Sequence, residues 1–145
     1  MYGSVMDADT YFGTVLQTEA WDNASSTDKG KALEMATRDI DALNYISDKL
    51  EFDQVNEWPR KQIESEVVPT NIKYATYEQG KAYLEGKEQD AEYDATTIET
   101  QSFGPVRTVN NSSPIHVRNG ILSIVAWRFL KPYLRSSRHI ELVRG

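Results

Sequence analysis

Residues 27–43 are the stretch that most constrains how this chain can fold. Apolar side chains recur there at steps of three and four residues, so a helix places them in one stripe: Leu33, Ala36, Ile40 and Leu43. Ser26 or Thr27 supplies a hydroxyl for the N-cap of this helix. Because the other faces are charged, the stripe needs apolar partners from the rest of the chain. We therefore expect this amphipathic helix at the centre of the fold.

Two further helices are predicted in the first 90 residues. Residues 7–16 form a short helix with Asp7 as its cap, and Trp21 anchors the polar loop that follows. Residues 67–86 form a longer helix with an apolar face. Gly80 lies inside this helix and costs about 1 kcal/mol relative to alanine. A glycine at this position weakens the prediction of a continuous helix.

The second half of the chain is predicted to contain one apolar helix and one hairpin. Residues 114–131 are apolar over more than half of a helix circumference, which favours a central helix. Residues 96–110 are rich in threonine and β-branched residues around a Gly104-Pro105 turn, which indicates a β-hairpin. We expect a mainly α fold, a four-helix bundle with a β-hairpin insertion at about 96–110. The helical domain spans residues 1–134, and an extended C-terminal arm spans 135–145.

Composition excludes several classes of protein. The chain has 145 residues and no cysteine, which excludes a disulfide framework and a thiolate metal site. Its N-terminus lacks the basic and apolar regions of a signal peptide. The most apolar run, residues 121–130, is too short to cross a bilayer. We expect a single domain that is made and folds in a cytoplasm, without a membrane partner.

Charge is distributed unevenly along the chain. Residues 1–100 hold 21 acidic and 9 basic side chains, whereas residues 101–145 hold 1 acidic and 7 basic side chains. A molecule that is acidic in its first part and basic in its last part could pack head-to-tail with its own copies, bind an acidic protein or bind nucleic acid. Solvated surface charge without a partner is the fourth interpretation.

The sequence contains no pattern that predicts catalysis. The two histidines, His116 and His139, have no cysteine partner and are not spaced as a helical pair of metal ligands. A glycine motif for cradling phosphate is also missing, and the carboxylates do not fall into a known motif. We therefore expect a protein that is not an enzyme and that uses neither a metal nor another cofactor.

A weak signal for nucleic-acid binding lies in the basic third of the chain. Positive charge is combined there with aromatic rings, as in proteins that bind single strands. The cations are Arg128, Lys131, Arg135, Arg138 and Arg144, with Trp127 and Tyr133 as the aromatic residues. Trp127 falls within the predicted apolar helix, which favours a place in the core.

An ordered set of short motifs resembles one group of small proteins from tailed bacteriophages. The motifs are Tyr2-Gly-Ser-Val-Met-Asp, Ala20-Trp21, Lys31-Ala-Leu33, Trp58-Pro59-Arg60, Pro69 with Ile72-Lys73, Gly104-Pro105-Val106 and Leu130-Lys-Pro132-Tyr133-Leu134. These proteins resemble head–tail adaptors, also termed connector or head-completion proteins. Similar sequences also carry the label DnaT-like single-stranded DNA-binding. Another neck or tail-completion component is a further alternative.

The adaptor resemblance implies a structural virion protein at the head–tail interface, synthesised in the cytoplasm of a bacterial host. Such adaptors form a ring, usually of twelve copies, that binds the portal protein and a downstream tail or nozzle protein and lines the channel for genomic DNA. The resemblance assigns portal docking to the C-terminal residues Arg135, Arg138, His139, Ile140, Leu142, Val143 and Arg144. Candidates for facing the channel or a neighbouring copy are Glu88, Asp90, Glu92, Asp94, Phe103 and Arg107.

Overall fold

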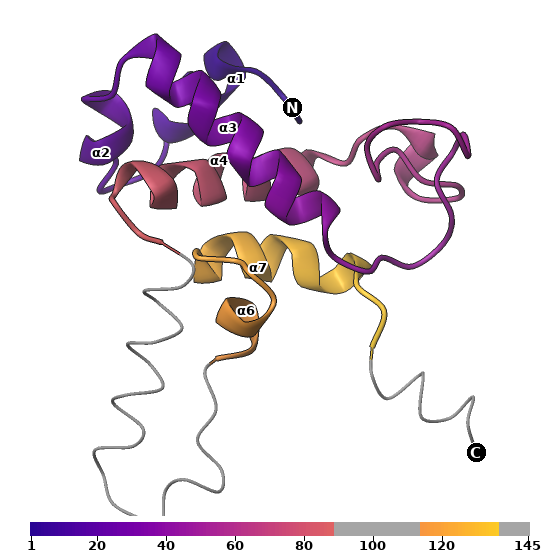
Figure 1. Cartoon of the computed structure of the whole chain (residues 1–145). Coiled ribbons are helices and arrows are strands. Elements are labelled where there is room, and N and C mark those ends of the chain that lie inside the picture. Colours follow the sequence, from indigo (N-terminus) through magenta and orange to yellow (C-terminus); the bar gives the residue numbers. More distant parts are fainter. Residues whose placement is uncertain (89–113, 137–145) are drawn as a thin grey trace, which may run out of the picture.

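Two helices, α3 (Ser26–Asp41) and α4 (Thr70–Leu84), cross at the centre of the computed structural model, which describes residues 1–88 and 114–136 (Figure 1). A third helix, α7 (Ile124–Leu130), packs against α4 on the side away from α3. The other described elements are α1 (Val5–Phe12), α2 (Glu19–Asp22), η1 (Glu64–Glu66), α6 (Ile115–Arg118) and η3 (Lys131–Tyr133).

The expected mainly α fold is confirmed, but the described residues do not form a four-helix bundle. They contain two crossed helices of 15 to 16 residues surrounded by short helical segments. The described ranges contain no strand, and their only β-type pairings are two isolated bridges, Tyr45 with Leu134 and Lys49 with Arg60. The hairpin predicted at 96–110 and most of the predicted arm at 135–145 lie outside the described residues.

The predicted stripe of α3 forms the centre of the core. All four of its residues are buried, so this prediction is confirmed: Leu33, Ala36, Ile40 and Leu43. The predicted cap was wrong by one position, because the helix begins at Ser26 and Ser25 precedes it. The Ser25 hydroxyl oxygen accepts a hydrogen bond from the backbone N–H of Asp28 at 3.1 Å, which satisfies one donor of the first turn.

The N-terminal helices differ from their predicted bounds. Ser4 caps α1 and accepts a hydrogen bond from the backbone N–H of Asp7, so Asp7 is not the cap. The helix ends at Phe12, and Leu16 is 87% exposed, so the predicted extension to residue 16 was wrong. Trp21 lies in α2 and is fully buried against Phe12, with ring centroids 4.9 Å apart. The ring anchors this segment as expected, although from a short helix instead of a loop.

Gly80 has a packing role that its helix propensity does not reveal. It lies in α4 where that helix crosses α3, and a Cβ atom there would be 3.1 Å from Cδ2 of Leu33. Because Leu33 has no exposed surface, it has little room to move. Glycine therefore permits the close approach of the two central helices, and α4 continues through this position to Leu84.

The continuous helix predicted at 114–131 was wrong. The chain forms α6, leaves the helical conformation at Gly120, where φ is +83°, and starts again at α7. Ser123 caps α7 by accepting a hydrogen bond from the backbone N–H of Ala126 at 3.1 Å. An apolar run supports one long helix or two short ones equally well, and the Asn119-Gly120 pair was the turn signal that distinguishes them.

A long loop between α3 and η1 is organised by Arg60, which is 6% exposed. Its guanidinium donates to the carbonyl oxygens of Ile46 at 2.9 Å and of Ser47 at 2.5 Å. It also donates to the carbonyl and the carboxylate of Glu57, both at 3.1 Å.

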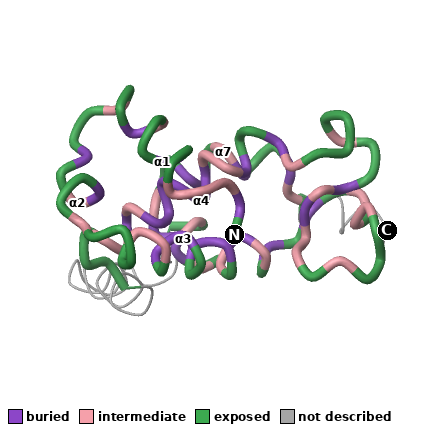
Figure 2. Tube along the Cα trace, turned by 90° about the horizontal axis from the view of Figure 1, so that it is seen from above, coloured by how far each residue is buried: buried purple, intermediate pink, exposed green. Residues whose placement is uncertain are grey.

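Viewed from above, the central helices carry much of the buried surface, and the loop tips are exposed (Figure 2).

Candidate nucleic-acid interface

The segment 114–136 is net positive and has no acidic residue of its own. Its four cations are all exposed: Arg118, Arg128, Lys131 and Arg135. In the two described ranges, no salt bridge joins any of them to a carboxylate. By contrast, residues 1–88 contain 17 acidic and 9 basic side chains. The segment 114–136 is therefore a basic region on an acidic body.

A groove of about 410 Å³ opens within this basic region. Its lining residues come from the end of α3 and from the segment 115–136: Leu43, Asn44, Ile115, Asn119, Trp127, Lys131, Leu134, Arg135 and Ser136. Apolar walls are combined here with two cations and two side-chain amides. This combination is suited to a ligand with a flat apolar part and a negative charge.

Arg135 is held in place at the edge of this groove. Its Nε donates to the carbonyl oxygen of Tyr45 at 2.8 Å, and its backbone N–H donates to the carbonyl oxygen of Asn44 at 3.0 Å. The adjacent Leu134 forms an isolated bridge with Tyr45. An arginine with a fixed stem loses less conformational entropy on binding an anion than one on a flexible chain.

The two aromatic residues of the predicted nucleic-acid signal are mostly buried. Trp127 is 7% exposed, which confirms its predicted place in the core, and Tyr133 is 9% exposed. The Tyr133 hydroxyl donates to the carboxylate of Glu64. Burial and this hydrogen bond to a carboxylate raise the pKa of Tyr133 to about 12. Neither ring offers a full face for stacking on a base, although Trp127 lines the groove.

Other sequence-predicted residues lie apart from this groove or outside the described chain. Glu88 is exposed and lines a separate recess between α3 and the end of α4. The remaining predicted site residues fall outside the described ranges: Asp90, Glu92, Asp94, Phe103, Arg107, Arg138, His139, Ile140, Leu142, Val143 and Arg144. Of the predicted portal-docking set, Arg135 alone is within them, bonded to the helical body.

Sequence reasoning missed the amide residues of the groove and the buried glutamine behind it. Asn44 lies three residues after the end of α3, and Asn119 is the C-cap of α6, so neither belongs to a motif. Gln79 is fully buried in α4, and its side chain holds the turn that precedes α7. The sequence did contain a signal for Gln79, because a polar side chain in the middle of an otherwise apolar helix face must find hydrogen-bond partners when it is buried.

The described part of the chain has neither a metal-binding cluster nor a membrane-spanning helix. No cluster of three histidine or carboxylate side chains suited to holding a metal ion lies within residues 1–88 and 114–136. Within the same part of the chain, no helix is both long enough and apolar enough to span a membrane.

The fold and the groove define a small, mainly helical protein with a groove in its basic region. A family model described as "Putative DnaT-like ssDNA binding protein" matches residues 1–145, and the chain therefore belongs to this family. Neither a curated protein nor a solved structure matches the chain. The resemblance to DnaT-like proteins is thus confirmed, whereas the relation to head–tail adaptors stays a prediction.

Proposed function

We propose that this protein binds single-stranded DNA along the face made by α6, α7 and η3. One observation carries the proposal. The four exposed cations Arg118, Arg128, Lys131 and Arg135 share a short segment that has no carboxylate to neutralise them. The description of the family supports the same ligand. The acidic residues of the remaining body repel phosphate, so a bound strand would be confined to this face.

The chemistry of such binding would be mainly electrostatic. Cations that neutralise phosphates release condensed counterions, so the affinity falls as salt rises, with a logarithmic slope of about −0.7 per phosphate for single strands. The groove beside Lys131 and Arg135 could admit part of one nucleotide, whose base would meet Trp127 and the amide of Asn119. Because Trp127 is 7% exposed, stacking would contribute little and sequence preference would be weak.

The test is fluorescence anisotropy of a labelled single-stranded oligonucleotide over a range of salt concentrations. The variant replaces Arg128, Lys131 and Arg135 with glutamine, and the matched control replaces Arg38, Lys61 and Lys73 on the acidic body. We expect the first variant to lose affinity at least tenfold and to show a salt slope shallower by about 2, since about three phosphate contacts are removed. The control should bind as the unaltered chain does. Equal loss in both variants, or no salt-dependent binding by the unaltered chain, would exclude the proposal.

A second candidate is the head–tail adaptor that the sequence motifs suggest. The observation that favours it is the acidic character of residues 1–88, with 17 acidic and 9 basic side chains, because an acidic wall does not retain passing DNA. In this proposal a ring of copies binds the portal protein, and the basic C-terminal residues supply the contact. The channel would be lined by the acidic body.

Native mass spectrometry of the protein mixed with its portal ring tests this second candidate. The comparison uses the full chain and a chain that ends at Ser136, which keeps the two bonds of Arg135 to Asn44 and Tyr45. A defined multimer on the portal that is lost on truncation supports docking through residues 137–145. If the full chain does not associate with the portal ring, the adaptor proposal is ruled out. This result would not bear on DNA binding, which the anisotropy experiment tests.

A further inference from the structure

Four consecutive backbone carbonyl groups, starting three residues after the end of α3, each accept a hydrogen bond from one of two arginines. They belong to the residues that we term the strap: Asn44, Tyr45, Ile46 and Ser47. Arg135 donates to the first two carbonyls, from its backbone N–H at 3.0 Å and from its Nε at 2.8 Å. Arg60 donates to the last two, from its Nε at 2.9 Å and from its Nη2 at 2.5 Å. The strap therefore connects two arginines that are far apart in the sequence.

Arg60 fixes its end of the strap from inside the fold. It is 6% exposed, and its guanidinium carbon lies 5.7 Å from the ring centroid of Tyr45 and 5.9 Å from that of Trp58. Ser47 has a φ of +67°, a left-handed conformation that a residue other than glycine keeps only where its surroundings hold it. Its carbonyl accepts from Arg60, and its hydroxyl donates to the carbonyl of Lys61, both at 2.5 Å. These bonds determine the backbone at this end.

Arg135 presents the other end of the strap to the groove. Its Nε is bonded to the strap, whereas its two Nη atoms make no hydrogen bond to any residue in the ranges 1–88 and 114–136. Four N–H donors of the guanidinium are thus left for an anion, in a planar fork that matches two oxygens of a phosphate. Because the bond to the Tyr45 carbonyl directs this fork, the position of the strap decides where the fork points.

We propose that Arg60 is a positioning residue for single-stranded DNA, because it fixes the strap and the strap fixes the guanidinium of Arg135 at the groove. The inference rests on the proposed function. Arg60 itself is buried under two aromatic rings and does not touch the strand. Its contribution to affinity is therefore indirect and exists only while Arg135 is present. A preorganised anion-binding group loses less conformational entropy on binding, and this saving is what Arg60 supplies.

A double-mutant cycle, read by anisotropy of the labelled oligonucleotide, tests this dependence. Arg60→Lys keeps the charge but replaces the fork that bonds two carbonyls at once. We expect it to raise the dissociation constant at least threefold in the unaltered chain and to have no further effect in a chain that carries Arg135→Gln. In a chain that carries Arg128→Gln, the threefold loss should persist, since Arg128 is not bonded to the strap.

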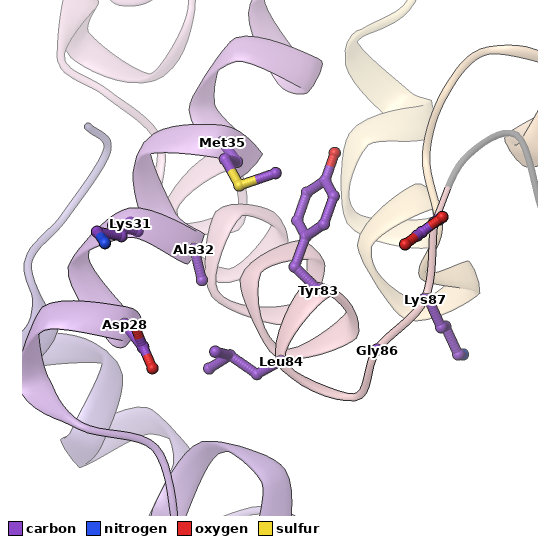
Figure 3. Close-up of a pocket in the computed structure, with 9 residues that line it drawn as sticks. Asp28, Lys31, Ala32, Met35, Tyr83, Leu84, Gly86 and Lys87 are labelled. Carbon is purple, nitrogen blue, oxygen red and sulfur yellow. The ribbon is translucent and has the colours of Figure 1, made fainter.

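Three further variants separate positioning from lost stability and from charge. Phe12→Leu weakens a buried cluster on the other side of the fold and should leave affinity unchanged. Lys31→Gln removes a cation from the recess between α3 and the end of α4, where Asp28 and Glu88 balance Lys31 and Lys87, and should also leave it unchanged (Figure 3). Glu57→Gln weakens the hold on Arg60, whose Nη1 donates to the Glu57 carboxylate at 3.1 Å. It should reproduce a smaller loss that again requires Arg135.

Hydrogen exchange without DNA reads the same coupling directly. The backbone N–H of Arg135 should exchange faster in Arg60→Lys, because its acceptor is the first carbonyl of the strap. An unchanged exchange rate there, or a loss of affinity of the same size with and without Arg135, would overturn the role of Arg60 and leave the proposed function standing. If the unaltered chain does not bind the oligonucleotide, the proposed function fails, and the role of Arg60 fails with it.

Discussion

The side chain of Gln79 holds the backbone of Leu122 across the interface between α4 and the turn before α7. Its Oε1 accepts hydrogen bonds from the N–H groups of Leu122 at 2.9 Å and of Ser123 at 3.2 Å. Its Nε2 donates to Oδ2 of Asp39 on α3 at 2.8 Å. One buried amide thus joins three segments that are far apart in the sequence: α3, α4 and the turn before α7.

Replacing Gln79 with alanine should destabilise the fold strongly. The change leaves the N–H groups of the buried Leu122 and the half-buried Ser123 without their acceptor and opens a cavity, so we expect the free energy of unfolding to fall by about 2–4 kcal/mol. Urea denaturation measures the loss. Gln17→Ala is the control, since the Gln17 side chain is exposed and should give a change below about 0.5 kcal/mol. Equal effects at both positions would contradict the role of Gln79.

Gly30 and Gly80, which lie inside the described helices α3 and α4, should respond in opposite ways to alanine. At Gly30 of α3 an added Cβ meets nothing within 4 Å, so Gly30→Ala should stabilise the protein by about 0.5–1 kcal/mol through helix propensity. At Gly80 the added Cβ would lie 3.1 Å from the buried Leu33, so Gly80→Ala should give no such gain and should destabilise the protein. Thermal unfolding of both variants provides the comparison. A gain at Gly80 equal to that at Gly30 would show that the crossing tolerates a methyl group.

The stability of the loop between α3 and η1 should depend on the planar, forked shape of the Arg60 guanidinium as well as on its charge. Arg60→Lys keeps the positive charge but cannot reach Ile46, Ser47 and Glu57 together, so we expect a loss of about 1–3 kcal/mol in the free energy of unfolding. Hydrogen exchange should rise at the amide of Leu50. Arg38→Lys, on the exposed face of α3, is the matched control and should change neither quantity.

The stability of the fold should decline at alkaline pH because several tyrosines are buried in their protonated, neutral form. Burial and the hydrogen bond to Glu64 raise the pKa of Tyr133 to about 12, and burial with Asp41 as acceptor raises the pKa of Tyr2 as well. The unfolded chain has a tyrosine pKa of about 10. A group whose pKa is higher in the folded state contributes its full stabilisation below the unfolded value and loses it as pH rises through the folded value.

We therefore expect the urea midpoint to fall between about pH 10 and pH 12. Tyr133→Phe removes one of the groups responsible, so its midpoint should decline less steeply over the same range. Parallel curves for the unaltered chain and Tyr133→Phe would show that Tyr133 does not ionise in this transition.

The sequence determined the central helix and the separation of charge, because both depend on local order. The stripe of Leu33, Ala36 and Ile40 has a spacing that only a helix places on one face, and the segment after residue 113 is basic by composition alone. The burial of Trp127 followed from its place in an apolar run. These features can be predicted without knowing which segments pack against each other in the core.

Only the tertiary structure decided which surfaces meet. Gln79 of α4 is hydrogen-bonded to the carbonyl oxygen of Gly120 and to the N–H of Leu122, about 40 residues away in the sequence, and Gly80 is explained by the approach of α3. The groove joins Asn44 to Arg135, and the recess joins Met35 to Leu84. Such pairings arise from the packing of distant segments, and local propensity carries no information about them.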